Sequence, residues 1–85
     1  MIGGMPKPFQ SYKEHPELAA FGQAVRAFRL EMGLSQEALA DEAGIDRSYM
    51  GGIERGEHNL ALINIKKIAS ALNQPVSELM RLARL

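Results

Sequence analysis

The sequence predicts an all-α fold, a compact domain of five short helices. Apolar residues recur at spacings of three and four, and no segment alternates apolar and polar residues as a half-buried strand would. The chain has 85 residues and no cysteine, so apolar packing alone must hold one core. A hydrophobic fraction of 46% is typical of a folded globular domain.

The first 16 residues predict a flexible N-terminal arm that precedes a domain over residues 17–85. Met5 lies within this arm and is an alternative start of the protein. Glycines and prolines remove helix and central-strand conformations from the arm; they are Gly3, Gly4, Pro6, Pro8 and Pro16.

The first helix is expected from Leu18 to the neighbourhood of Gly33. Its apolar residues follow the helical period and form one stripe: Leu18, Phe21, Val25, Phe28 and Met32.

The second helix is expected over residues 36–43, with the Ser35 hydroxyl as its N-cap and Gly44 as a left-handed C-cap. Asp46 can cap a third helix over residues 47–55, which places Met50 and Ile53 on its inward side.

A polar loop at residues 57–60 separates the third helix from the fourth. The apolar face of the fourth helix comprises Leu62, Ile65, Ile68, Ala69 and Leu72. Asn73 is expected to end the fourth helix in a left-handed conformation, and Pro75 to open the fifth. The fifth helix has an apolar side formed by Leu79, Met80 and Leu82.

The run from Gln36 to Arg55 resembles the helix-turn-helix of the Xre family, the phage Cro and repressor type of DNA-binding domain. The segments LSQEALA, AGIDRSY, IERGEHN and IKKIASAL are similar to family segments, and the likeness covers Phe21 to Leu79. Small Ala40 lies where the two helices of the motif cross, and Gly44 makes the turn. The resemblance implies a repressor-like domain whose second and third helices form the helix-turn-helix.

One face of the third helix is expected to enter the major groove with its side chains uncovered. Arg47 can pair with guanine, and Ser48 can bond to either base type; the alternative for Arg47 is a solvated charge paired with Asp46. The adjacent Gly51 and Gly52 would let the backbone approach the bases, or leave room for the C5-methyl of thymine and for neighbouring long side chains. The alternative is a third helix that has lost the ability to read DNA.

Further DNA contacts are implied by the resemblance. It assigns Gln36 to a phosphate contact and to bracing the third helix, and Arg55 with Asn59 to phosphate contacts in the loop after it. Tyr49 either packs over the third helix or donates its hydroxyl to a phosphate. Glu54 is expected to be structural, paired with Arg55 or with a first-helix arginine, either Arg26 or Arg29.

Charge and motif content limit the remaining functions. Ten basic and ten acidic residues cancel, which argues against a polybasic chain that coats nucleic acid. His15 and His58 are far apart in loops without cysteine partners, so we expect no metal, no cofactor and no enzymatic activity. No leader and no run of about 20 apolar residues is visible, which favours a cytoplasmic protein without membrane contact.

The last two helices predict more apolar surface than a small core needs. The apolar residues concerned are Leu72, Val76, Leu79, Met80, Leu82 and Leu85. We assign part of this surface to a homodimer interface, whereas the alternative places all of it inside one protomer.

The expected function is that of a transcriptional regulator, acting as a homodimer on a palindromic operator in double-stranded DNA without a small-molecule ligand. The DRSYMGGIERG run most resembles restriction-modification controllers, and phage repressors and antitoxins are similar. The alternative function is a protein-interaction module such as the antitoxin of a toxin-antitoxin pair.

Overall fold

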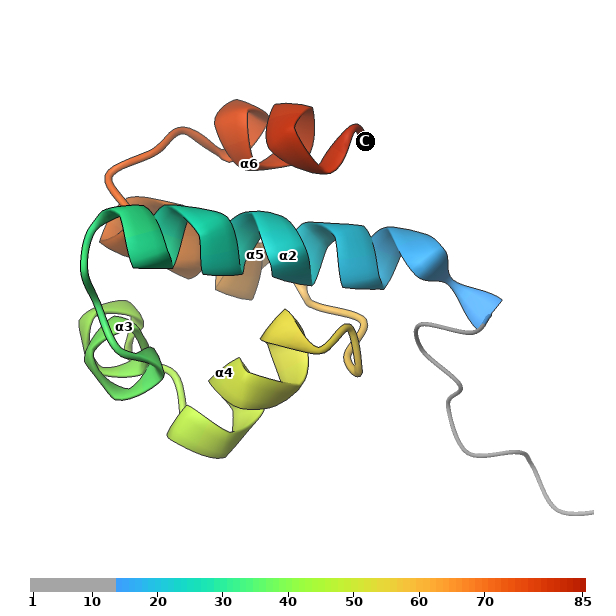
Figure 1. The fold of residues 1–85 in the computed structure, drawn as a ribbon. Coiled ribbons are helices and arrows are strands. Elements are labelled where there is room, and N and C mark those ends of the chain that lie inside the picture. Colours follow the sequence, from blue (N-terminus) through green and yellow to red (C-terminus); the bar gives the residue numbers. More distant parts are fainter. Residues whose placement is uncertain (1–13) are drawn as a thin grey trace, which may run out of the picture.

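The computed structural model describes residues 14–85, which form five helices and no strand. They are α2 (Pro16–Glu31), α3 (Gln36–Ala43), α4 (Arg47–Glu54), α5 (Leu62–Ala71) and α6 (Val76–Ala83). The long α2 crosses the molecule with α6 on one side and α3 and α4 on the other, while α5 lies behind it (Figure 1). The predicted all-α class is therefore confirmed. None of these helices is both long and apolar enough to cross a membrane.

The helix α2 begins at Pro16, two residues earlier than predicted from the apolar stripe. The first helical turn tolerates proline, because the missing N–H would have no partner within the helix. Pro16 therefore opens the helix and is not part of an arm. The other expectations for the arm, including the alternative start at Met5, fall on residues outside the described part of the chain.

All five helices contribute side chains to one core. The largest fully buried side chains are Val25, Leu39, Met50, Ile53, Ile68, Leu72 and Leu79. Three members of the predicted apolar stripes are exposed, namely Met32, Leu62 and Leu82. Met32 is exposed because it follows the last turn of α2 as its C-cap, and Leu62 is 74% exposed in the first turn of α5.

The same left-handed turn ends every helix among residues 14–85. In each case the residue that follows the left-handed one donates its N–H to a carbonyl five residues earlier, as Leu34 does to Arg29 at 3.0 Å. The predicted stops at Gly44 and Asn73 are confirmed with φ of 67° and 55°. The residues in this conformation are Gly33, Gly44, Gly56, Asn73 and Arg84.

The closest approach of α2 to α4 depends on Gly22, a residue that sequence patterns did not single out. A Cβ at this position would clash with the carbonyl oxygen of Ile53 and would lie 2.6 Å from that of Glu54. Gly56, with φ of 79°, continues this contact, because its own Cβ would lie 2.7 Å from the Cα of Ala19. The two glycines thus let the backbones of α2 and the end of α4 touch.

We expect Gly22→Ala to lower the free energy of unfolding by about 1 to 3 kcal/mol, the usual cost of overpacking. The methyl group would push against backbone atoms of α4 that cannot rotate away. Urea unfolding followed by circular dichroism measures the change. The neighbouring exposed substitution Gln23→Ala is the control and should stay within about 0.5 kcal/mol of the parent. Equal stability of both variants would contradict the close approach.

Candidate nucleic-acid interface

The helices α3 and α4 are joined by a three-residue turn with caps at both starts. Gly44 ends α3 in the left-handed conformation, and Asp46 precedes α4. The Ser35 hydroxyl accepts the N–H of Ala38 at 3.0 Å, and the Asp46 carboxylate accepts that of Tyr49 at 3.2 Å. Both predicted N-caps are confirmed. Ala40, the predicted crossing residue of the motif, is buried at 2% exposure.

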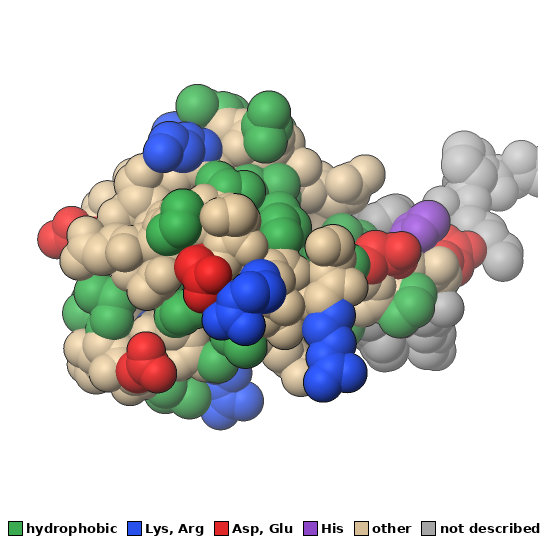
Figure 2. Space-filling model, turned by 90° about the horizontal axis from the view of Figure 1, so that it is seen from above, with side chains coloured by type: hydrophobic (Ala, Val, Ile, Leu, Met, Phe, Trp, Pro, Cys, Tyr) green, Lys and Arg blue, Asp and Glu red, His purple; other side chains and the backbone are tan. Residues whose placement is uncertain are grey.

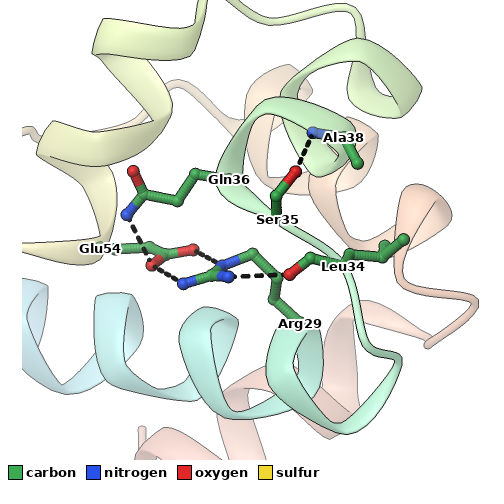
Figure 3. Close-up of polar contacts among 6 residues, drawn as sticks. All are labelled: Arg29, Leu34, Ser35, Gln36, Ala38 and Glu54. Atoms are coloured by element: carbon green, nitrogen blue, oxygen red, sulfur yellow. Dashed lines mark hydrogen bonds and ion pairs between the residues drawn. The ribbon is translucent and has the colours of Figure 1, made fainter.

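A buried ion pair fixes the end of α4 to α2. The Nε of Arg29 donates to Oε2 of Glu54 at 2.7 Å, and Nη2 donates to Oε1 at 3.0 Å. The remaining terminal nitrogen, Nη1, donates to the carbonyl of Leu34 at 2.8 Å (Figure 3). Only 9% of the Arg29 side chain and 2% of that of Glu54 are exposed. Of the partners left open for Glu54, Arg29 is therefore the correct one.

Gln36, the first residue of α3, joins this pair. Its amide nitrogen donates to Oε1 of Glu54 at 3.0 Å, so α3 and α4 are tied to each other as well as to α2 (Figure 3). This bond provides the bracing that was expected of Gln36. Since three elements meet at one carboxylate, the orientation of α4 depends on Glu54.

The first turn of α4 is exposed. Arg47 leaves 67% of its side chain in solvent and lies 3.6 Å from Glu37 of α3, not paired with Asp46. Such an exposed pair contributes about 0 to 1 kcal/mol, so a phosphate or base can compete for this guanidinium. Ser48 donates its hydroxyl to Asp46 at 2.9 Å. This bond, together with the Tyr49 N–H, holds the pKa of Asp46 below its usual value.

The expectation that Gly51 and Gly52 lie uncovered is wrong, because both are buried under side chains from elsewhere in the chain. A Cβ at Gly51 would lie 3.1 Å from Nη1 of Arg55 and 3.3 Å from Oε1 of Gln36. A Cβ at Gly52 would overlap the imidazole of His58. The other half of the expectation is confirmed, since the glycines leave room for neighbouring long side chains.

The residues after α4 form a second polar cluster. Arg55 donates Nε to Glu57 at 2.7 Å and Nη2 at 3.2 Å, and this hydrogen bond lowers the pKa of the Glu57 carboxyl. Tyr49 is half-buried with its ring centroid 4.6 Å from that of His58, which supports the packed alternative for its ring. Asn59 is exposed. The sequence analysis considered His58 only as a possible metal ligand. Its place in this cluster is evident only from its position over Gly52 in the folded chain.

The predicted dimer residues divide into two groups. Leu72 and Leu79 are 1% and 0% exposed, so they belong to the core of one protomer and cannot face a second copy. Val76 and Met80 are partly buried, whereas Leu82 and Leu85 are exposed. Hydrophobic side chains with acidic and basic ones between them are visible on the face that carries α6 (Figure 2).

Residues 25–79 match the helix-turn-helix family. The control protein C.BamHI of Bacillus amyloliquefaciens is 46% identical over 61 residues, which cover 71% of this chain and 75% of that protein. A hypothetical transcription factor of Neisseria meningitidis is 42% identical over 62 residues. That match covers 73% of this chain and only 58% of the relative.

The crystal structure of the restriction-modification controller protein C.AhdI from Aeromonas hydrophila has a similar fold. It is 51% identical with a TM-score of 0.75, and the match covers 76% of this chain and 98% of that one. The crystal structure of the wild-type controller protein C.Esp1396I, at 29% identity, has a TM-score of 0.74.

We expect Glu54→Gln to destabilise the protein by about 3 to 5 kcal/mol, because it leaves the Arg29 guanidinium buried without a counter-charge. Urea unfolding gives the magnitude. The matched control is Glu57→Gln, the same chemical change at the exposed pair with Arg55, and it should leave the free energy of unfolding almost unchanged. Similar losses in both variants would show that burial of the Arg29 pair is not the cause.

Proposed function

The chain belongs to the helix-turn-helix family, of the Xre type, and from this membership we propose that it binds a two-fold symmetric DNA operator as a homodimer. Members of this family are DNA-binding transcriptional regulators, and the chain is one of them. The single observation that supports the proposed binding mode is the exposed first turn of α4 on a rigidly held helix-turn-helix.

The α4 helix enters the major groove with Arg47 and Ser48 at its leading end. Arg47 can turn from Glu37 to a guanine edge at little cost, since the pair it leaves is exposed. Gln36 and Arg55 meet over Gly51, and we assign both to the sugar-phosphate backbone on that side. Asn59 is assigned to the same backbone, while Tyr49 supports the interface by packing its ring against His58. These contacts set the position of α4, while Arg47 and Ser48 supply selectivity.

The physiological role that fits best is that of a restriction-modification controller. C.AhdI, 51% identical to this chain, is a restriction-modification controller protein, and C.BamHI and C.MunI, 46% and 40% identical, are named control proteins. We propose regulation by occupancy of a promoter in the cytoplasm, without a small-molecule ligand or catalysis. Within residues 14–85 no group of three His, Asp or Glu side chains could hold a metal ion.

The homodimer is proposed to form through the C-terminal face. Leu82 and Leu85 lie exposed at the end of α6, with Met80 and Val76 partly buried beside the core. Burying them against the same residues of a second copy would remove apolar surface from water. Two copies then present two α4 helices to half-sites about 34 Å apart, one turn of the duplex.

A salt titration of duplex binding tests the function. Neutralising several phosphates per protomer makes log affinity fall with log salt at about 0.9 per phosphate, and we expect a steep slope. Fluorescence anisotropy on a labelled duplex of upstream DNA, between low and physiological salt, measures it. No duplex binding at low salt, or a flat response, would favour the rival function of a protein-interaction module, to which the zero net charge is suited.

Arg47→Ala should weaken binding to the selected operator by about 1 to 3 kcal/mol, because a bidentate guanine contact is lost. Binding to mixed-sequence DNA should remain almost the same. The control is Lys67→Ala, which removes an exposed basic side chain of α5 that is assigned neither to DNA nor to the dimer face. An equal loss of affinity for all sequences would make Arg47 a phosphate contact instead of a base contact.

A further inference from the structure

The imidazole of His58 occupies the space that a side chain at position 52 would fill. An added Cβ on Gly52 would overlap Nε2 of the ring and lie 2.7 Å from its Cδ2 atom. Glu57 approaches the same point from the loop, with Oε1 3.4 Å away. The loop after α4 thus folds back over the helix, and Gly52 is the residue type that allows it.

The ring is held in place without using its polar atoms. It packs against Tyr49 with centroids 4.6 Å apart and ring planes inclined by 36°. His58 is half-buried, and neither of its ring nitrogens makes a hydrogen bond to another residue of the described chain. A fixed, half-exposed imidazole with unused hydrogen-bonding capacity is suited to binding an external group.

Position 52 lies on the part of α4 that would face the groove. Ser48 and Gly52 are four residues apart, so they share one side of the helix and lie about 6 Å apart along its axis. A side chain at position 52 would therefore reach a base pair further along the groove than Ser48 does. Gly52 itself has no atoms to do so.

We propose that His58 is a specificity-determining residue, whose imidazole replaces the missing side chain of Gly52 and contacts a base edge in the major groove. This inference rests on the proposed function, in which α4 enters that groove. A neutral imidazole offers one N–H donor and one acceptor, and a guanine presents O6 and N7 as acceptors at its major-groove edge. The base contact comes from the loop after α4, and Gly52 provides the space for it.

Selection from a randomised duplex library tests the assignment, with the parent, His58→Ala and His58→Phe compared. Phenylalanine keeps the ring over Gly52 and against Tyr49 but removes both nitrogens. We expect both variants to bind the parent's consensus about 5- to 150-fold more weakly, the range of one base contact. The lost preference should be confined to one base pair in each half-site, with affinity for mixed-sequence duplex maintained.

Three outcomes overturn the inference. His58→Ala that selects the parent's consensus unchanged would show that the ring contacts no base. His58→Phe that binds like the parent would reduce His58 to a packing role. If the parent protein binds no duplex at all, the proposed function fails and this inference fails with it. In the first two outcomes the parent still binds its consensus, so the proposed function stands.

A double-variant comparison gives an independent check. Gly52→Ala places a methyl group against the His58 ring and should displace it, with the preference lost at the same base pair. In a His58→Ala background the same methyl group meets no ring and should add no further loss. Additive losses from the two substitutions would contradict the proposed link between Gly52 and His58.

Discussion

The arrangement of the helix-turn-helix depends on the buried carboxylate of Glu54. It accepts two hydrogen bonds from Arg29 of α2 and one from Gln36 of α3, so three helices are oriented around one group. Exchanging such an ion pair for apolar side chains often leaves stability unchanged, whereas removing one partner leaves an uncompensated buried charge. These bonds connect α4 to α2 and to the first residue of α3.

The two ends of α4 consequently have different roles. The last turn is immobilised by Glu54 and by the backbone contact at Gly22, whereas the first turn carries exposed Arg47 and Ser48. Between them, Gly51 and Gly52 accommodate side chains from α3 and from the following loop. The surface presented by α4 is therefore composite, because several of its outward atoms belong to residues outside that helix.

The sequence predicted the helices well because their signals are local. Ser35, Asp46, Gly44 and Asn73 act on neighbouring backbone groups, so their roles can be read from position alone. Glu54 was narrowed to three possible partners, but only the packing of α2 on α4 selects Arg29. The proximity of Arg29 to Glu54, like that of His58 to Gly52, arises only in the folded chain and leaves no local signal in the sequence.

The same limit explains the errors at the C-terminal helices. Leu72 and Leu79 have the same apolar character as Leu82, and periodicity shows that they share a face without showing what covers it. The core formed by α2, α5 and α6 buries two of them and leaves the third outside. Gly22 was missed for a related reason, since a single glycine within a helix carries no positional meaning until a second backbone lies against it.

The exposure of the first turn of α4 also bears on how this protein can diversify. Arg47 and Ser48 are exposed, so in the proposed binding mode exchanging them would alter recognition without disturbing the core. A lineage could thus acquire a new DNA target in single steps, each through a stable intermediate. Changes at Gly22 or Glu54 offer no comparable route, because they would cost the fold before any new preference arose.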